Sequence, residues 1–220
     1  MKKIDAVLFD MDGVIFDTEN VYLDIWTKVF EKYGYTMTLD VYISVMGTGR
    51  ENVIKTFLEI YGEDLPIGEM YIEKDKKLEK VIKNGLVPTK QGAKEILNYF
   101  KQKNYKIALA TAAKRDRVAM QLKMADMIDI FDDIVCGDDI KFGKPNPEIF
   151  LKAAQKLSVD PGKCLVIEDS PAGIKAAFNA KMTGIHVEDL KKADEEILNY
   201  CYKSFKNLLE IQEYFNNLEI

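Results

Sequence analysis

The stretch VLFDMDGVIFDTE, residues 7–19, decides how this sequence is interpreted. Its first residues belong to an apolar run of strand length, IDAVLF (4–9), and Asp10 and Asp12 follow at once, ahead of Gly13. Two carboxylates this close repel each other when both are ionised, so their proximity needs a cause. Three causes are open at this point: a bound metal ion, a covalent reaction at one aspartate, or a solvated turn.

Further apolar runs of strand length follow later in the chain. They are 106–110 (KIALA), 133–136 (DIVC), 163–167 (KCLVI) and 182–187 (MTGIHV). Near-continuous apolar runs suit the strands of a parallel sheet that is buried on both faces. Helical patterns alternate with these runs from residue 90 onward. Strand–helix alternation predicts an α/β fold with a doubly wound, Rossmann-like parallel sheet.

The segment 15–84 shows only helical periodicity. Val21, Ile25 and Val29 recur at four-residue spacing, and Trp26 with Phe30 lies beside them as an expected helical core. This much helix after one strand is too long for a simple crossover. We therefore predict an all-helical cap domain over 15–84, inserted into an α/β core made of 1–14 and 85–220.

The bulk properties exclude several classes of protein. The net charge of −5 argues against a nucleic-acid-binding surface, and no apolar stretch reaches the 18 residues of a membrane span. Cys136, Cys164 and Cys201 form no CxxC pair, which is typical of reduced thiols in a cytoplasmic protein. The only histidine, His186, has no nucleophile near it in sequence, and we predict a strand-end or loop residue without a catalytic role. Nothing indicates an obligate oligomer, so a monomer is expected.

The predicted strand ends carry an unusual set of polar side chains. They are Asp10 and Asp12, Thr111, Lys144 (with Lys141 as a nearby alternative), and Glu168 with Asp169. Because ligands bind outside the carboxyl ends of parallel strands, these side chains are expected to face one crevice.

This cluster predicts phosphoryl-transfer chemistry. Four carboxylates need a compensating cation, and all-oxygen ligands select a hard metal such as Mg²⁺. One aspartate can serve as a nucleophile that forms an aspartyl phosphate, while the second, two residues on, acts as acid and base. Thr111 and Lys144 would hold the phosphoryl oxygens.

These residues resemble the four motifs of the haloacid-dehalogenase-like (HAD) hydrolase superfamily. The matching segments are DMDGV (10–14), Thr111 in ALAT, Lys144 in GKPNPEIF, and EDSPAGI (168–174). Their order and spacing match along essentially the whole chain, and the helical insertion resembles that superfamily's cap. DTE (17–19) and MGTGR (46–50) extend the resemblance to the β-phosphoglucomutase and sugar-phosphate phosphatase branch.

The resemblance implies a role for each matched residue at the metal. Asp10 would be the nucleophile and a Mg²⁺ ligand. Asp12 would be the acid and base, with its backbone carbonyl also on the metal. Asp169 would be a metal ligand, and Glu168 either a direct or a water-mediated one.

It also implies residues that contact the substrate. Thr111, the backbone at Ala112, and Lys144 would bind the transferring phosphoryl group. The residues expected to contact the rest of the substrate are Thr18, Gly47, Arg50 and Lys114. For Arg50 and Lys114 a solvated position at the start of a helix stays open.

One position separates two activities of this branch. The mutase pattern has a cap histidine where this chain has Tyr22, and tyrosine, with a reference pKa of about 10, does not replace an imidazole near neutral pH. Ala113 and Arg115 stand where the mutase pattern has serine and asparagine. The sequence therefore favours a Mg²⁺-dependent phosphatase of a small phosphorylated metabolite, with a sugar phosphate as the expected substrate. A phosphosugar mutase and a non-catalytic phosphometabolite-binding protein are the alternatives.

Overall fold

The chain divides into two compact units. The computed structural model describes residues 3–46 and 50–218. One unit, here called the core unit, comprises Met1–Asp17 and Pro88–Ile220. The other, the helical unit, comprises Thr18–Val87 and is inserted into the core unit along the chain.

The junctions between the units lie three residues later than the sequence predicted, after Asp17 rather than after residue 14, and before Pro88 rather than before residue 85. Backbone hydrogen bonds within the core unit explain the difference. The Asp17 N–H donates to the Pro88 carbonyl at 2.9 Å, and the Lys90 N–H donates to the Ile15 carbonyl at 2.9 Å. The segment 15–17 is thereby tied to the core.

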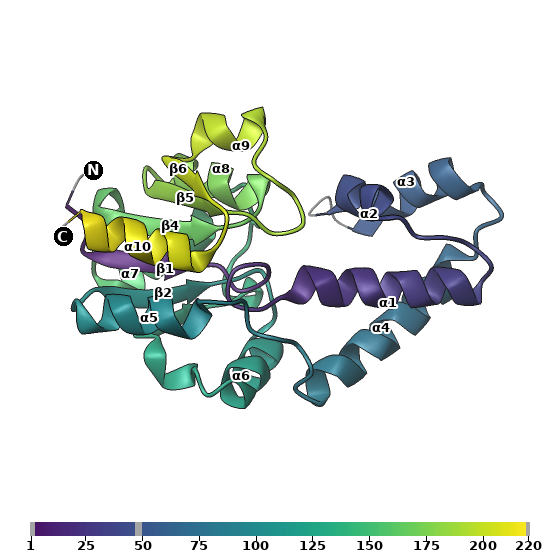
Figure 1. The fold of residues 1–220 in the computed structure, drawn as a ribbon, viewed down its shortest axis with the longest axis horizontal. Coiled ribbons are helices and arrows are strands. Elements are labelled where there is room, and N and C mark those ends of the chain that lie inside the picture. The colour runs from purple at the N-terminus through teal and green to yellow at the C-terminus, as the bar shows by residue number, and fades with distance from the viewer. Residues whose placement is uncertain (1–2, 47–49, 219–220) are drawn as a thin grey trace. The chain divides into compact units, whose positions relative to one another are not determined.

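The core unit is built on a parallel sheet. Its strands within the described residues are β1 (Ala6–Phe9), β2 (Lys106–Ala110), β3 (Asp133–Val135), β4 (Cys164–Glu168), β5 (Thr183–Val187) and β6 (Lys203–Phe205). They lie in the order β3-β2-β1-β4-β5-β6, and every neighbouring pair is parallel (Figure 1). The predicted α/β fold with a doubly wound parallel sheet is confirmed. The sequence did not predict β6, because Phe205 is the one buried residue of this short edge strand, which contains no apolar run.

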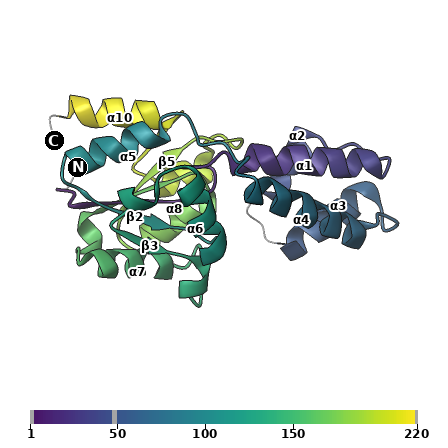
Figure 2. The ribbon, with the colours of Figure 1, turned by 90° about the horizontal axis from the view of Figure 1, so that it is seen from below.

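Helices cover both faces of this sheet. They are α5 (Ala93–Gln102), α6 (Arg115–Met124), α7 (Glu148–Leu157), α8 (Pro171–Asn179), α9 (Glu195–Tyr200) and α10 (Leu208–Asn217), with the short turns η1 (Ile128–Ile130), η2 (Gly137–Asp139) and η3 (Pro161–Lys163). Figure 2 shows α5 and α10 together on one face and α7 on the other. Side chains alternate along a strand, so Phe9 of β1 meets Phe100 of α5 at 6.2 Å between ring centroids, while Leu8 belongs to the cluster around Phe150 of α7.

The helical unit contains α1 (Thr18–Lys32), α2 (Leu39–Val45), α3 (Arg50–Tyr61) and α4 (Ile67–Lys83). Its core is aromatic, as the sequence predicted for Trp26 and Phe30. Trp26 lies 5.7 Å from Phe30 and 5.5 Å from Phe57 between ring centroids, in edge-to-face arrangements. Such pairs stabilise a small core beyond their buried area.

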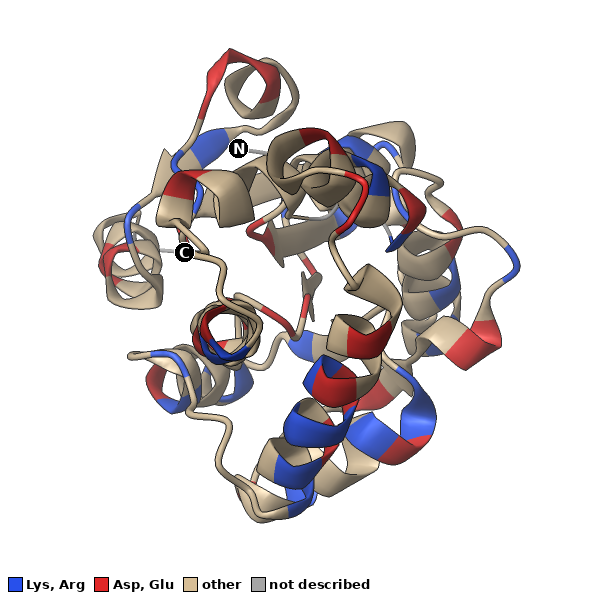
Figure 3. Ribbon diagram, turned by 90° about the vertical axis from the view of Figure 1, so that its right-hand side faces the viewer, with Lys and Arg blue, Asp and Glu red and all other residues tan. Residues whose placement is uncertain are grey.

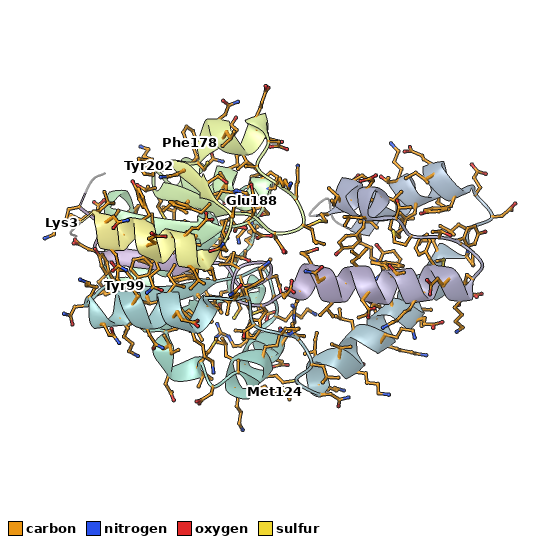
Figure 4. The ribbon with its side chains drawn as sticks, viewed as in Figure 1. Lys3, Tyr99, Met124, Phe178, Glu188 and Tyr202 are labelled. Carbon is orange, nitrogen blue, oxygen red and sulfur yellow. The ribbon has the colours of Figure 1, made fainter. Side chains whose placement is uncertain are left out.

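The surface features agree with an ordinary globular protein. Acidic and basic residues are interspersed on the same helices (Figure 3). Large exposed apolar side chains such as Met124, Phe178 and Tyr202 are present (Figure 4).

All three cysteines are free. Within the described part of the chain, no helix is both long and apolar enough to cross a membrane.

Candidate active site

The candidate site lies at the carboxyl ends of the three central strands. The strand order reverses at β1, which has β2 on one side and β4 on the other. Asp10 follows β1 directly, Thr111 follows β2, and Glu168 is the last residue of β4. Backbone bonds hold the first two in place: Asp10 N–H donates to Ile167 O and Thr111 N–H donates to Val135 O, both at 3.0 Å. The crevice at such a reversal is where open α/β sheets bind ligands.

Three buried carboxylates meet at this point. Asp10, Glu168 and Asp169 each offer an oxygen, and these oxygens lie within 4.8 Å of one another. Gly13 packs directly against one of them, Asp169. It has a φ of +77°, and a Cβ there would lie 2.2 Å from Asp169 Oδ2. Both the backbone conformation and the contact require glycine at this position.

Lys144 brings a positive charge to these carboxylates. Its Nζ forms an ion pair with Asp10 and lies 2.6 Å from Glu168 Oε2. Its side chain is only 10% exposed, which places the charge among the carboxylates. Lys141, the alternative left open by the sequence, is exposed, and its Nζ lies 5.2 Å from the ring centroid of Phe142. The structure therefore brings Lys144 to the site.

Burial and neighbouring charge set the protonation of the cluster. Burial raises the pKa of Asp10 to about 7 in spite of Lys144, and the neighbouring carboxylates act in the same direction. Burial also raises the pKa of Asp169 well above its ordinary value, again helped by Glu168 and Asp10. For Glu168 burial is outweighed by Lys144 and by bonds from Ser170, so its pKa is lowered. The carboxylates in turn raise the pKa of Lys144.

This donor set fits a hard divalent cation. One lysine cannot neutralise three buried carboxylates, and burial together with the neighbouring carboxylates raises the pKa of both Asp10 and Asp169. All three groups offer oxygen, which Mg²⁺ prefers. Asp10, Glu168 and Asp169 would hold such an ion. The predicted contribution of the Asp12 carbonyl stays a prediction.

We expect the affinity for Mg²⁺ to depend steeply on pH. A ligand must lose its proton before it binds a metal. Since the pKa of Asp10 in the metal-free protein is about 7, the apparent affinity should fall by about tenfold or more for each pH unit below that value. Calorimetric titrations at pH 5.5, 6.5 and 8 measure this. Equal affinities at all three pH values would contradict the assigned ligands.

The predicted phosphate-binding residues lie beside this cluster. Thr111 is almost fully buried, and its Oγ1 accepts a hydrogen bond from the Ala113 N–H at 3.1 Å. Lys144 Nζ lies 3.4 Å from the carbonyl oxygen of Ala110, the residue before Thr111. Ala112 is exposed. The structure thus brings Thr111 and Lys144 together at the end of β2.

Sequence reasoning missed Arg117. This residue of α6 forms an ion pair with Asp12, and its Nε donates to Gln121 Oε1 at 2.8 Å. Gln121 is buried, so the guanidinium is fixed from both sides. No motif marks Arg117, because its partner lies 105 residues earlier in the chain. Only the fold brings the two together.

The remaining predicted substrate contacts are divided between the two units. Lys114 is exposed at the N-cap of α6. Thr18 and Arg50 are the first residues of α1 and α3 and belong to the helical unit. Gly47 lies outside the described residues.

The helical unit has a pocket of its own, with a volume of about 370 Å³. Its lining includes Glu19, Tyr22, Trp26, Tyr42, Arg50, Tyr71 and Lys74. Lys74 Nζ lies 5.7 Å from the ring centroid of Tyr22, and Arg50 Cζ lies 4.3 Å from that of Tyr71. Two cations among aromatic rings, with one carboxylate, suit a small polar or anionic group.

Comparison with known proteins decides the family. Residues 7–187, well over half of the chain, match the haloacid dehalogenase-like hydrolases. The chain belongs to the haloacid dehalogenase-like hydrolase family. The order of motifs, the parallel sheet and the place of the helical insertion in the chain are those expected from the resemblance in sequence.

Individual relatives place the chain within this family. A phosphorylated carbohydrates phosphatase of Thermotoga maritima is 34% identical over 183 residues, covering 83% of this chain and 84% of the relative. The mitochondrial (DL)-glycerol-3-phosphatase 1 of Arabidopsis thaliana is 29% identical over 218 residues, covering 95% and 72%. The crystal structure of β-phosphoglucomutase from Clostridium difficile matches with a TM-score of 0.70 at 29% identity, covering 98% of both chains. The protein is a phosphatase of the HAD family, in the β-phosphoglucomutase and sugar-phosphate phosphatase branch.

Proposed function

We propose that this protein is a Mg²⁺-dependent phosphomonoesterase that hydrolyses a small phosphorylated metabolite, with sugar phosphates as the leading substrate class. The observation that carries the proposal is the buried cluster of Asp10, Glu168 and Asp169 around Lys144, at the sheet's central reversal. The Thermotoga maritima and Arabidopsis thaliana relatives, which are named for phosphorylated carbohydrates and for glycerol 3-phosphate, support the substrate class.

The first half of the reaction transfers the phosphoryl group to Asp10. A carboxylate oxygen of Asp10 forms a bond to phosphorus as the bond between phosphorus and the ester oxygen breaks. Asp12 donates its proton to the departing alkoxide. Lys144 and Thr111 hold the phosphoryl oxygens throughout. Mg²⁺, held by Asp10, Glu168 and Asp169, would neutralise charge on the phosphoryl oxygens.

The second half returns Asp10 to its free form. Asp12 accepts a proton from a water molecule, whose oxygen attacks phosphorus, and the bond between Asp10 and phosphorus breaks to release inorganic phosphate. Asp12 must point at the ester oxygen in one half and at water in the other. The ion pair with Arg117 restrains the direction of this carboxylate.

The pocket of the helical unit offers charged and polar side chains to a ligand. Arg50 and Lys74 offer positive charge, and Glu19 with Tyr42, joined by a 2.6 Å hydrogen bond, offers polar contacts for hydroxyl groups. We propose that this pocket binds a small polar or anionic group. The predicted substrate contacts at Thr18, Gly47, Arg50 and Lys114 stay predictions.

A phosphosugar mutase is the second candidate, because the β-phosphoglucomutase of Clostridium difficile has a similar structure. In a mutase the sugar itself, rather than water, accepts the phosphoryl group. Tyr22 lines the pocket of the helical unit where a mutase would carry histidine, and its hydroxyl is a poor general base near neutral pH. This favours water as the acceptor.

A substrate panel tests the proposal. Hexose phosphates, glycerol 3-phosphate, nucleoside 5′-monophosphates and a phosphopeptide are each incubated with Mg²⁺ or with excess EDTA. We expect phosphate release from one or more small esters with Mg²⁺, none above background with EDTA, and little from the peptide. Formation of glucose 6-phosphate from β-glucose 1-phosphate without free phosphate would support the mutase instead. Tight binding of esters without any turnover would point to a binding protein.

A further inference from the structure

The chain's only histidine lies directly behind the acidic cluster. His186 is a residue of β5 and is fully buried. Its Nε2 lies 3.0 Å from the backbone oxygen of Asp169, and its Nδ1 lies 2.7 Å from Ser204 Oγ. The strand register explains this arrangement, because Glu168, His186 and Ser204 are paired across β4, β5 and β6. Glu188, labelled in Figure 4, marks the chain just beyond this end of β5.

The two hydrogen bonds define which tautomer a neutral imidazole adopts here. A backbone carbonyl oxygen can only accept, so Nε2 carries the proton and donates it to Asp169 O. Nδ1 is then the acceptor and receives the hydroxyl proton of Ser204. Both ring nitrogens are therefore satisfied in a neutral ring whose orientation Ser204 fixes.

These bonds fix the peptide group that follows Asp169. On one side of this peptide, the Ser170 N–H donates to Glu168 Oε1 at 3.1 Å. On the other side, its carbonyl oxygen accepts from His186. The peptide plane cannot rotate without breaking one of these bonds. The adjoining Asp169 carboxylate is also confined by Gly13, where even a methyl group would overlap it.

We propose that His186, oriented by Ser204, is a positioning residue that holds the Asp169–Ser170 peptide and thereby keeps the Asp169 carboxylate in the geometry that binds the metal. The inference rests on the metal site of the proposed function. Groups that orient a metal ligand from behind it commonly change metal affinity by about 10- to 100-fold when they are replaced. The sequence predicted a residue without a catalytic role, and His186 contacts no reacting atom in this assignment.

Mg²⁺ titration of the substrate-free protein by calorimetry tests the proposal. In His186→Leu we expect Mg²⁺ affinity to fall by about 10- to 100-fold. His186→Gln, whose amide N–H can still donate to the carbonyl, should recover most of the loss. Ile185→Val is the matched control, since Ile185 is the preceding buried residue of β5 and points to the opposite face. It should lower the unfolding temperature and leave Mg²⁺ affinity unchanged.

Other outcomes of the titration would overturn the proposal. A folded His186→Leu variant with wild-type Mg²⁺ affinity would show that His186 only packs in the core and does not position Asp169. If that variant does not fold, Ser204→Ala decides: a several-fold weaker affinity supports the positioning role, and an unchanged affinity overturns it. A wild-type protein that binds no Mg²⁺ would overturn the metal site itself, which separates failure of the proposed function from failure of this inference.

Nuclear magnetic resonance supplies a second readout. Because the tag-free chain contains one histidine, its imidazole nitrogens give a single, unambiguous pair of signals. We expect the proton on Nε2, and we expect both signals to shift as Mg²⁺ is added. A proton on Nδ1, or signals that do not respond to Mg²⁺, would contradict the proposed contact.

Discussion

Replacing Asp10 with asparagine is expected to lower phosphatase kcat by on the order of 10,000-fold or more. Asparagine cannot form the covalent bond to phosphorus through which the phosphoryl group passes from substrate to water. The other two buried carboxylates of the site, Glu168 and Asp169, lie at the end of β4 rather than at the end of β1. Steady-state assays of phosphate release with the best ester of the panel measure the effect.

The same variant should remain folded. The folded-state pKa of Asp10, about 7, lies above the ordinary value of 3.8. This group therefore stabilises the fold fully below about pH 4 and loses that contribution as the pH rises to 7. Asparagine resembles the protonated acid, so at pH 8 the unfolding temperature of the metal-free variant should equal or exceed that of the wild type.

Asp5→Asn is the matched control for this change. Asp5 lies just before β1, at the opposite end of the strand, and pairs with Lys163 at the surface at 3.0 Å. Loss of this exposed ion pair should change the unfolding temperature little, and kcat should not change. Robust turnover by Asp10→Asn would contradict the assignment of Asp10 as the nucleophile.

Replacing Lys144 with methionine is expected to damage both catalysis and stability. Methionine fills similar space but provides no charge to the phosphoryl oxygens, which should lower kcat/KM by about 100- to 1000-fold. It also leaves Asp10 and Glu168 without their buried partner. Breaking a buried pair in this way costs about 3–5 kcal/mol of unfolding free energy. Enzyme kinetics and chemical denaturation measure the two effects.

Lys141→Met provides the comparison for that variant. Lys141 lies three residues earlier and is exposed, so its replacement should leave both kcat/KM and stability near wild-type values. Mg²⁺ should partly restore the stability of Lys144→Met, because the ion supplies positive charge to the same carboxylates. Equal activity of Lys144→Met and the wild type would contradict the assignment of the phosphate-binding cation.

The fold could be predicted largely because its signals are local. Each central strand is a buried apolar run, as in the segment 4–9, and a polar residue such as Asp10 or Thr111 follows it directly. The rule that parallel strands present their carboxyl ends at one edge then joins distant segments into one site. The edge strand β6 lacks such a run, and the junction at Asp17 depends on a bond to Pro88 that no periodicity reveals.

The supporting residues of the site could not be predicted for a related reason. Arg117 and Ser204 are ordinary polar residues in sequence, and their importance comes from partners far away in the chain. His186 looks like any histidine near the end of a strand until β4 and β5 pair in register. Sequence motifs identify groups that act on the substrate, whereas the groups that hold them in position are identified from the folded structure.

The stereochemistry at phosphorus tests the central claim most directly. A phosphorothioate ester whose two non-bridging oxygens are different isotopes is hydrolysed in water of a third isotope, and the chirality of the released thiophosphate is determined. Transfer first to Asp10 and then to water inverts phosphorus twice, so the account predicts net retention of configuration. Net inversion would mean that water attacks the substrate directly, and would contradict an aspartyl-phosphate intermediate.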